Sequence, residues 1–272
     1  MAYRGPYNNY LVQKQSDGSI RVMSQSTAEG PDTLTNVQIL QFSDQSIDST
    51  SIGQVPAPVI TAVVNAADFK SEALSAGAWI SILGQNLGQA ETAASVNTVT
   101  LGWASVSVCG MPAVLSYNSG PINTNGSTSW QINALLPDGV AGQASCPMVV
   151  TVGGQASQPV SVAITSGIME VFRFTSSAGT LPTITHADYS LVGPVNAGLA
   201  PAKPNETVIA WATGDCSTPT TTVGGTPAAV AFSGRVAAGL CQINFTVPKS
   251  PGGSNQLSFS TSPNPYSLWI SE

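Results

Sequence analysis

Hydrophobic positions along the chain come in short runs, and several of these runs alternate with polar positions. The alternation is visible at Val106 and Val108 and again at Val149 and Thr151. Side chains two positions apart in a strand share a face, so this pattern is typical of half-buried β-strands. It predicts strands at residues 79–83, 104–108, 113–117, 129–136, 148–152 and 160–164. Gly-rich and Asn-rich turns separate these runs and long helical periodicity is absent, which indicates an all-β fold.

The chain also contains a long internal repeat. The segment WQINALLP at residues 130–137 returns as CQINFTVP at residues 241–248, and the segments before each copy correspond as well. The spacing is close to the roughly 100 residues of an immunoglobulin-like domain. We therefore expect two antiparallel β-sandwiches, over residues 56–166 and 167–272. Within each Q-I-N core we expect Ile132 and Ile243 to point inward.

The first 55 residues differ from the repeat. Two short apolar runs, at residues 10–15 and 19–23, flank the turn sequence Ser-Asp-Gly at residues 16–18. This arrangement predicts a β-hairpin. We expect residues 1–55 to form a short β-hairpin extension that ends in a polar linker.

Composition limits the partners of the chain. Only 8% of the residues are charged, and the net charge is −6 without any basic cluster. A nucleic-acid backbone and an anionic membrane surface are therefore poor partners. No apolar run reaches the roughly 20 residues of a membrane span. Residues 1–6 lack the apolar segment of a signal peptide, so we expect an export signal elsewhere or a longer precursor.

Four cysteines divide evenly between the two repeats. Pairing within each repeat is the simplest arrangement and predicts the disulfides Cys109–Cys146 and Cys216–Cys241. Buried free thiols are the next alternative, and a metal site is the last because no CxxC motif is present. Disulfides indicate an environment outside the cytoplasm. The expected location is therefore secreted or at the cell surface.

One segment of the extension resembles a known calcium-associated motif. Residues 30–44 match the pattern D-x-L-x-N-(V/I)-x-x-L-x-F-x-D, with Gln38 in place of the usual glutamate. The segment resembles the closing segment of secreted bacterial proteins of the RTX type, whose glycine-rich repeats bind calcium. Those repeats, which supply most of the calcium ligands, are absent here. A calcium ion held by Asp32, Asp44 or Asp48 is one interpretation, and turn-capping aspartates facing water are the other.

The rest of the chain resembles two further families. Residues 78–88, AWISILGQNLG, are similar to the immunoglobulin-like IPT/TIG domain. From about residue 56 onward the chain resembles the uncharacterised Solibacter-type C-terminal domain of large exported acidobacterial proteins. The residues that carry this second resemblance are 64–67, 82–87, 202–208 and both Q-I-N cores. The resemblance implies the fold and an exported setting, and no activity.

Candidate catalytic chemistry is sparse. His186 is the single histidine, and in a strand it would share a face with Asp188. Such a pair could activate water against an ester or lactone, or bind a metal, although a plain hairpin strand explains the segment too. No G-x-S-x-G motif is present. Ser119 and Ser233 each precede glycine at corresponding places in the repeats, which indicates a turn requirement rather than a nucleophile.

Aromatic residues suggest binding of a carbohydrate as a further hypothesis. Trp79 and Trp211 occupy corresponding strands of the repeats, so we expect both in the core. Trp103 and Trp269 are the better candidates for a surface that stacks against sugar rings.

The sequence as a whole favours an exported, non-catalytic surface or accessory module for adhesion, display or polymer binding. Its partners would be neighbouring domains of a longer parent or an extracellular polymer. A small-ester or lactone hydrolase, with or without calcium, is the first alternative. A dedicated carbohydrate-binding module is the second.

Overall fold

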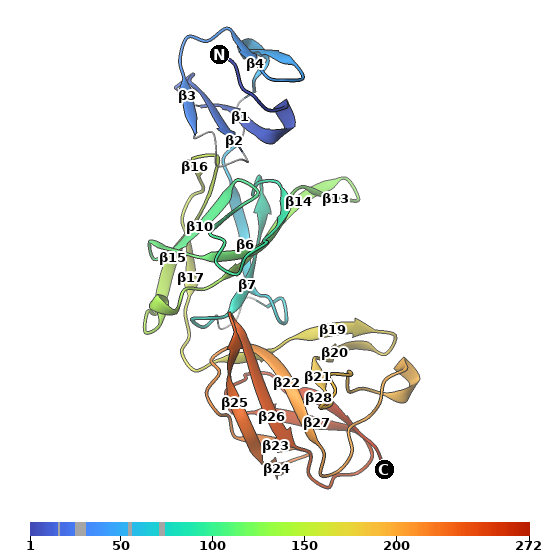
Figure 1. The fold of residues 1–272 in the computed structure, drawn as a ribbon. Coiled ribbons are helices and arrows are strands. Elements are labelled where there is room, and N and C mark those ends of the chain that lie inside the picture. The colour runs from blue at the N-terminus through green and yellow to red at the C-terminus, as the bar shows by residue number, and fades with distance from the viewer. Residues whose placement is uncertain (16, 25–30, 54–55, 71–73) are drawn as a thin grey trace.

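A computed structural model describes residues 1–15, 17–24, 31–53, 56–70 and 74–272. Figure 1 shows three β units in a row, with the N-terminal unit at one end and the second sandwich at the other. The sheets are antiparallel throughout their paired strands, so the predicted all-β fold of two sandwiches is confirmed. Within the described part of the chain, no helix has the length and apolar character needed to cross a membrane.

The N-terminal unit contains the expected hairpin and more. Strands β1 (Tyr10–Lys14) and β2 (Ile20–Ser24) pair antiparallel; Ser16, in the expected turn, lies outside the described residues. Beyond the hairpin the unit adds β3 (Asp32–Leu34), the pair β4 (Ile39–Gln41) and β5 (Ser46–Asp48), and two 3-10 turns, η1 (Tyr7–Asn9) and η2 (Ser49–Ser51).

This extension has a small core of its own. The ring of Phe42 lies 5.2 Å from the rings of Tyr3 and Tyr10, and Leu40 is fully buried. The N-terminal unit is therefore larger than the hairpin that we expected. Apolar residues of segment 30–44 pack against aromatic residues near the start of the chain and complete a separate core.

The first sandwich is built from two sheets. One sheet has the order β6-β7-β14-β12-β8, with β13 paired to β14; its strands are β6 (Val59–Asn65), β7 (Trp79–Gln85), β8 (Ala90–Thr92), β12 (Val114–Ser119), β13 (Ile122–Thr124) and β14 (Ser127–Leu135). The other has the order β11-β10-β15-β16, with β9 and β17 alongside; its strands are β9 (Thr100–Leu101), β10 (Ala104–Val108), β11 (Met111–Pro112), β15 (Ser145–Val152), β16 (Gln155–Ala156) and β17 (Val160–Ala163). A 3-10 turn, η3 (Asp138–Val140), follows β14.

The second sandwich repeats this plan with changes. One sheet has the order β18-β22-β26-β25, with β21 on β22; its strands are β18 (Met169–Val171), β21 (Ile184–Thr185), β22 (Thr207–Gly214), β25 (Val230–Ala237) and β26 (Leu240–Thr246). The facing sheet contains β23 (Thr221–Val223), β24 (Thr226–Ala228), β27 (Gly253–Phe259) and β28 (Tyr266–Ile270). A separate hairpin, β19 (Arg173–Ser176) and β20 (Gly179–Pro182), and the 3-10 turn η4 (Val195–Ala197) complete the unit.

The Q-I-N cores occupy equivalent central strands. Strand β14 lies between β7 and β12, and β26 lies between β22 and β25. Ile132 pairs with Ile82, Ile243 pairs with Ala210, and both isoleucines are fully buried. The sequence repeat therefore marks the central strand of one sheet in each sandwich, with isoleucine pointing inward as expected.

Both expected disulfides are present. Cys109–Cys146 joins the end of β10 to β15, and Cys216–Cys241 joins the residues after β22 to β26. Figure 1 shows β10 and β15 in the middle unit of the row and β22 and β26 in the C-terminal unit. The two copies are thus crosslinked at different positions of the same architecture.

Removing either disulfide should destabilise its own sandwich. The bridges close loops with sequence separations of 37 and 25 residues. In the chain-entropy model, loops of this size stabilise by about 3–4 kcal/mol. We expect denaturant titrations of the two double Cys→Ala variants to show losses of that order, and a reductant to have no further effect at the replaced pair. Unchanged unfolding midpoints would contradict the assigned bridges.

Candidate functional site

His186 stands at the start of a turn rather than inside a strand. Strand β21 ends at Thr185. The His186 N–H then donates to the Ser190 carbonyl (2.9 Å) and the Tyr189 N–H donates to the His186 carbonyl (3.0 Å), which closes a turn. The Asp188 carboxylate accepts hydrogen bonds from the Ser190 N–H (3.0 Å) and hydroxyl (2.6 Å). Such local bonding competes with strand pairing, which explains why the strand stops here.

The imidazole of His186 bonds to two acceptors. Its Nδ1 lies 2.5 Å from Glu206 Oε1, and its Nε2 lies 3.2 Å from the Ala200 carbonyl oxygen. The other oxygen of Glu206 accepts the Lys203 N–H at 2.7 Å. Because both partners of the ring can only accept, both ring nitrogens carry a proton when the two bonds are formed.

The electrostatics of His186 agree with this geometry. Burial lowers the pKa of His186, but the hydrogen bonds to Glu206 and Ala200 and the charges of Glu206 and Asp188 outweigh burial and raise it above the ordinary value. A general base needs a ring nitrogen that is free to accept a proton. The expected His186–Asp188 pair is therefore corrected to a His186–Glu206 pair, in which the imidazolium links β21 to the turn before β22.

The three aspartates of the calcium hypothesis each have a hydrogen-bonding role. Asp32 Oδ2 accepts from the Tyr3 hydroxyl (3.1 Å), and Asp44 Oδ1 accepts from the Tyr7 N–H (2.8 Å). Asp48 caps η2 through the Thr50 N–H (2.8 Å). Among the described residues, no three His, Cys, Asp or Glu side chains come together as a metal-binding group.

The hydroxyls of Ser119 and Ser233, the two serines that precede glycine in the repeats, make different hydrogen bonds. Ser119 Oγ accepts the Gln131 N–H at 2.8 Å and donates to the Gly120 carbonyl. Ser233 Oγ donates to the Cys216 carbonyl at 3.0 Å. Neither lies against the imidazole of His186, whose two partners are given above.

The amides of the Q-I-N cores bond mainly to one another. Gln131 Nε2 donates to Asn133 Oδ1 (2.7 Å) and to Ser81 Oγ (3.2 Å), and Gln242 Nε2 donates to Asn244 Oδ1 (2.9 Å). These hydrogen bonds satisfy the side-chain amides on the strand face opposite the buried isoleucines. The Q-I-N cores are therefore structural.

Two tryptophans that we expected in the core lie elsewhere. Trp211 is half-buried, donates from Nε1 to Thr185 Oγ1 (3.0 Å) and has its ring 6.1 Å from that of exposed Tyr189. Trp79 is also half-buried, and it lies at the junction between the sandwiches. The two tryptophans also stand at different positions of corresponding strands, since Trp79 pairs with Leu135 of β14 and Trp211 pairs with Gln242 of β26.

Trp79 is held by the tip of the β25–β26 hairpin of the second sandwich. Its indole Nε1 donates to the Ala238 carbonyl (2.9 Å), and its backbone N–H donates to Thr213 Oγ1 (2.8 Å). Gly239, with φ +65°, lies so close that an added Cβ would overlap the Trp79 ring and Leu135 Cδ1. We call this contact set, Trp79 and Leu135 against Thr213, Ala238 and Gly239, the clasp.

Two polar contacts accompany the clasp. Ser75 Oγ donates to the Ile168 carbonyl (2.6 Å), and the Arg235 guanidinium pairs with both oxygens of Asp138 (2.9 and 3.0 Å). The side chain of Asp138 is 70% exposed. Exposed ion pairs contribute at most about 1 kcal/mol, so the Arg235–Asp138 pair adds little to the junction.

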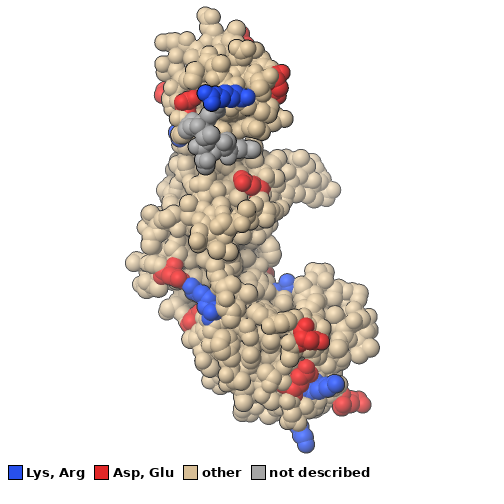
Figure 2. Space-filling model, in the orientation of Figure 1, with Lys and Arg blue, Asp and Glu red and all other residues tan. Residues whose placement is uncertain are grey.

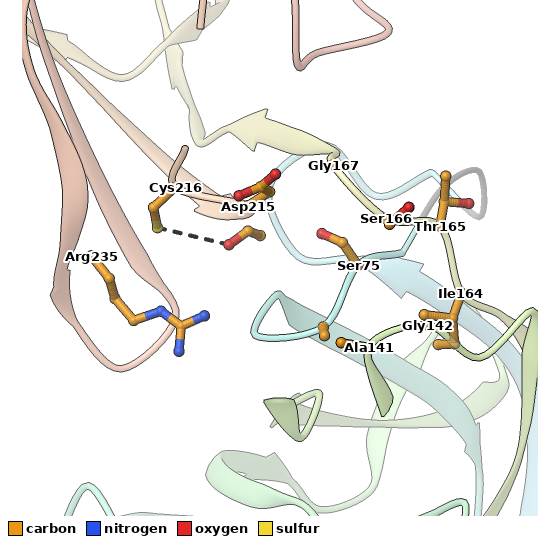
Figure 3. Close-up of a pocket in the computed structure, with 12 residues that line it drawn as sticks. Ser75, Ala141, Gly142, Ile164, Thr165, Ser166, Gly167, Asp215, Cys216 and Arg235 are labelled. Atoms are coloured by element: carbon orange, nitrogen blue, oxygen red, sulfur yellow. Dashed lines mark hydrogen bonds between the residues drawn. The ribbon is translucent and has the colours of Figure 1, made fainter. Parts of the chain in front are cut away.

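A small cleft lies beside the clasp. Figure 3 shows Arg235 reaching toward it from β25, with Asp215 next to Gly167 and Ser75 on the first sandwich. Its volume is about 190 Å³, below the roughly 300–1,000 Å³ of small-molecule sites. Asp215 already accepts two bonds from Ser217. The cleft is a packing feature of the junction.

A buried carboxylate nearby has no counterpart among the sequence predictions. Glu170 is 2% exposed and accepts hydrogen bonds from the Tyr266 hydroxyl (2.7 Å) and Asn264 Nδ2 (2.9 Å). Burial raises its pKa, although these two bonds act in the opposite direction. Lys70 of the first sandwich donates to Asn264 Oδ1 (3.2 Å), so the network crosses the junction. The sequence signal that could have pointed to a buried carboxylate is the single charged residue inside the apolar run IMEVF at residues 168–172.

The two surface candidates differ in setting. Trp269, in β28, is half-buried, and its buried Nε1 makes no hydrogen bond within the described part of the chain. Trp103 lies in the tight turn between β9 and β10 with φ +68° and lines a cleft between the N-terminal unit and the first sandwich. Of these two candidates, Trp103 is the one that combines partial exposure with a cleft beside it.

The His186–Glu206 bond predicts how stability depends on pH. A histidine whose pKa is higher in the folded state stabilises below the unfolded value of about 6.5, and this stabilisation is lost as pH rises through the folded pKa. We expect the free energy of unfolding to fall over that range in the wild type and to fall less in His186→Gln. The raised pKa of Glu170 also makes the free energy of unfolding depend on pH, in both proteins. The quantity to compare is therefore the difference between the free energies of unfolding of the wild type and His186→Gln at each pH. Parallel curves would contradict the assignment.

The calcium site stays a prediction from the sequence. A ligand that binds only the native state raises the apparent stability. Calcium bound by Asp32, Asp44 or Asp48 therefore requires a higher melting temperature in calcium chloride than in EDTA, and the Asp44→Asn variant should reduce that difference. Equal melting temperatures in the two buffers would contradict calcium binding.

Comparison with known proteins identifies no family. No protein-family profile matches the sequence, and no curated protein matches it. Among solved structures, 93% of the chain is similar to SGBP-B of the Bacteroides ovatus mixed-linkage glucan utilization locus, solved with a mixed-linkage heptasaccharide (12% identity, TM-score 0.37). The chain spans about half of that protein's length, 52%. It is also similar over 98% of its length to the I9-I11 tandem of titin, of which it covers 84% (10% identity, TM-score 0.22). Likenesses this distant carry no argument about function, and the fold class rests on the strands and cores above.

Proposed function

We propose that this chain is an exported, non-catalytic surface module for adhesion, display or polymer binding, in which the clasp holds the two sandwiches in a fixed row. The observation that carries the proposal is the contact of Trp79 with the β25–β26 hairpin tip. A module that displays a neighbour or a binding surface gains from a fixed junction, because the displayed surface then keeps its position.

The junction restrains the sandwiches in more than one place. The clasp joins the start of β7 to the end of β22 and to the hairpin tip, while Ser75 bonds the connecting segment at Ile168. Lys70 and Asn264 add a further contact between the units. Domains joined by a linker alone move relative to each other by default, so several separated contacts are what a fixed arrangement needs.

Export is supported by the cysteines. Both disulfides close within single sandwiches, and such bonds persist in oxidising environments outside the cytoplasm. Charged side chains are sparse and scattered on the face drawn in Figure 2. The RTX-like and Solibacter-type resemblances agree with an exported setting and remain part of this proposal. A parent protein that carries further domains is also part of this proposal.

The hydrolase alternative has weaker support. Ester or lactone hydrolysis by His186 needs a ring nitrogen that accepts a proton, whereas both nitrogens are engaged with Glu206 and Ala200. Asp188 is engaged with Ser190. The carbohydrate-binding alternative is a form of polymer binding and needs a site of its own.

The clasp can be tested by amide exchange at Trp79. Gly239→Ala places a Cβ against the Trp79 ring, whereas Gly225→Ala meets nothing within 4 Å; the two glycines have similar left-handed φ values of +65° and +79°. Both variants therefore carry the same backbone cost, about 1–2 kcal/mol. We expect faster hydrogen exchange of the Trp79 amide in Gly239→Ala and in Thr213→Val, but not in Gly225→Ala. Equal protection in all four proteins would contradict the clasp.

A further inference from the structure

The largest of the clefts described above lies at the other junction, between the N-terminal unit and the first sandwich. It has a volume of about 490 Å³, within the roughly 300–1,000 Å³ of small-molecule sites. Ser24 of β2 lines one side, and Gln89, Glu91, Thr100 and Trp103 of the first sandwich line the other. Trp103 and several polar side chains thus line the same cleft.

Trp103 is held in an unusual backbone conformation at the edge of this cleft. Gly102 and Trp103 form the two-residue turn between β9 and β10, and both are left-handed (φ +55° and +68°). Glycine and asparagine favour these positions, whereas a bulky residue there is an outlier. Strained residues persist where surrounding contacts enforce them, and they cluster at functional sites.

The surrounding contacts are visible around this turn. The Gly102 N–H donates to Glu91 Oε2 (2.5 Å), and its carbonyl accepts the Gln89 N–H (2.8 Å). The Trp103 carbonyl accepts the Gly153 N–H (3.2 Å). Gly102 also leaves no room for a Cβ, which would overlap the Gln89 carbonyl. The turn is therefore fixed from three sides, with the indole half-buried beside the cleft.

Polar groups of the cleft have hydrogen-bonding capacity left. Glu91, Gln89 and Thr100 are exposed. Within the described part of the chain, Glu91 uses one carboxylate oxygen on Gly102, and the Gln89 amide and Thr100 hydroxyl make no hydrogen bond. Together they offer a carboxylate oxygen, an amide and a hydroxyl close to an aromatic ring.

These features match one ligand chemistry. A pyranose ring presents C–H groups on a face that packs on an indole, and hydroxyls at its edge that bond to carboxylate and amide groups. The carboxylate of Glu91 and the net charge of −6 disfavour an anionic polymer. We propose that this cleft binds a neutral polysaccharide, with one sugar ring stacked on Trp103 and its hydroxyls bonded to Glu91, Gln89 and Thr100. The inference specifies the polymer of the proposed function and rests on it.

Affinity gel electrophoresis of the full chain tests the site. The gels contain hydroxyethylcellulose, xylan, starch or galactomannan as neutral polymers, and alginate as an anionic one. We expect the wild type to be retarded by at least one neutral polymer and not by alginate. Trp103→Gly should weaken that binding by about tenfold or more, as loss of an aromatic anchor does. Because glycine favours the left-handed turn, this variant should fold, and its melting temperature checks that.

A matched variant separates this site from the other aromatic candidate. Trp269→Ala removes a half-buried tryptophan of the second sandwich and should leave retardation unchanged. Binding that survives Trp103→Gly overturns the site while polymer binding stands. Absence of wild-type retardation by every neutral polymer, or retardation by alginate alone, overturns the ligand class. Neither result touches the clasp, which amide exchange at Trp79 decides separately.

Discussion

The packing of Trp79 against the β25–β26 hairpin tip is the contact on which the arrangement of the two sandwiches depends. Trp79 begins β7 and pairs with Leu135 at the end of β14, so it stands at one end of the first sandwich. The hairpin of the second sandwich reaches this end because β25 and β26 continue beyond their neighbours to Gly239 (Figure 1). Glycine is required at the tip, since any side chain there would overlap the indole. The ion pair of Arg235 with Asp138 is too exposed to replace this contact.

The duplicated architecture makes the specialised positions easier to recognise. Ile132 and Ile243 have the same role in both copies, whereas Trp79 and Trp211 do not. One tryptophan contacts the neighbouring sandwich, and the other packs on Tyr189 near the His186–Glu206 bond. The disulfides differ in the same way, each crosslinking its own copy at a different place. Where the copies differ, the chain meets a neighbouring unit or closes a local turn.

Much of the fold was predictable from the sequence because its signals are local. Period-two alternation located β7, β10, β12, β14, β15 and β17, and the repeat located the central strands. The disulfides followed from simple pairing within each copy. The candidate site was less predictable, because its partners are distant: the Trp79 indole bonds a carbonyl 159 residues away, and Lys70 contacts Asn264 across 194 residues. The hydrogen-bond partner of His186 was missed for the opposite reason, since Asp188 is nearer in sequence but bonds its own turn, while Glu206 lies 20 residues away.

Distances between spin labels across the junction test the central claim most directly. Asn97 and Thr226 are exposed and lie on different sandwiches, so labels at these positions report how the two units sit relative to each other. A clasp that holds the sandwiches in place predicts one narrow distance distribution in the wild type, which broadens in Gly239→Ala. A broad distribution in the wild type, unchanged by that substitution, would contradict the account.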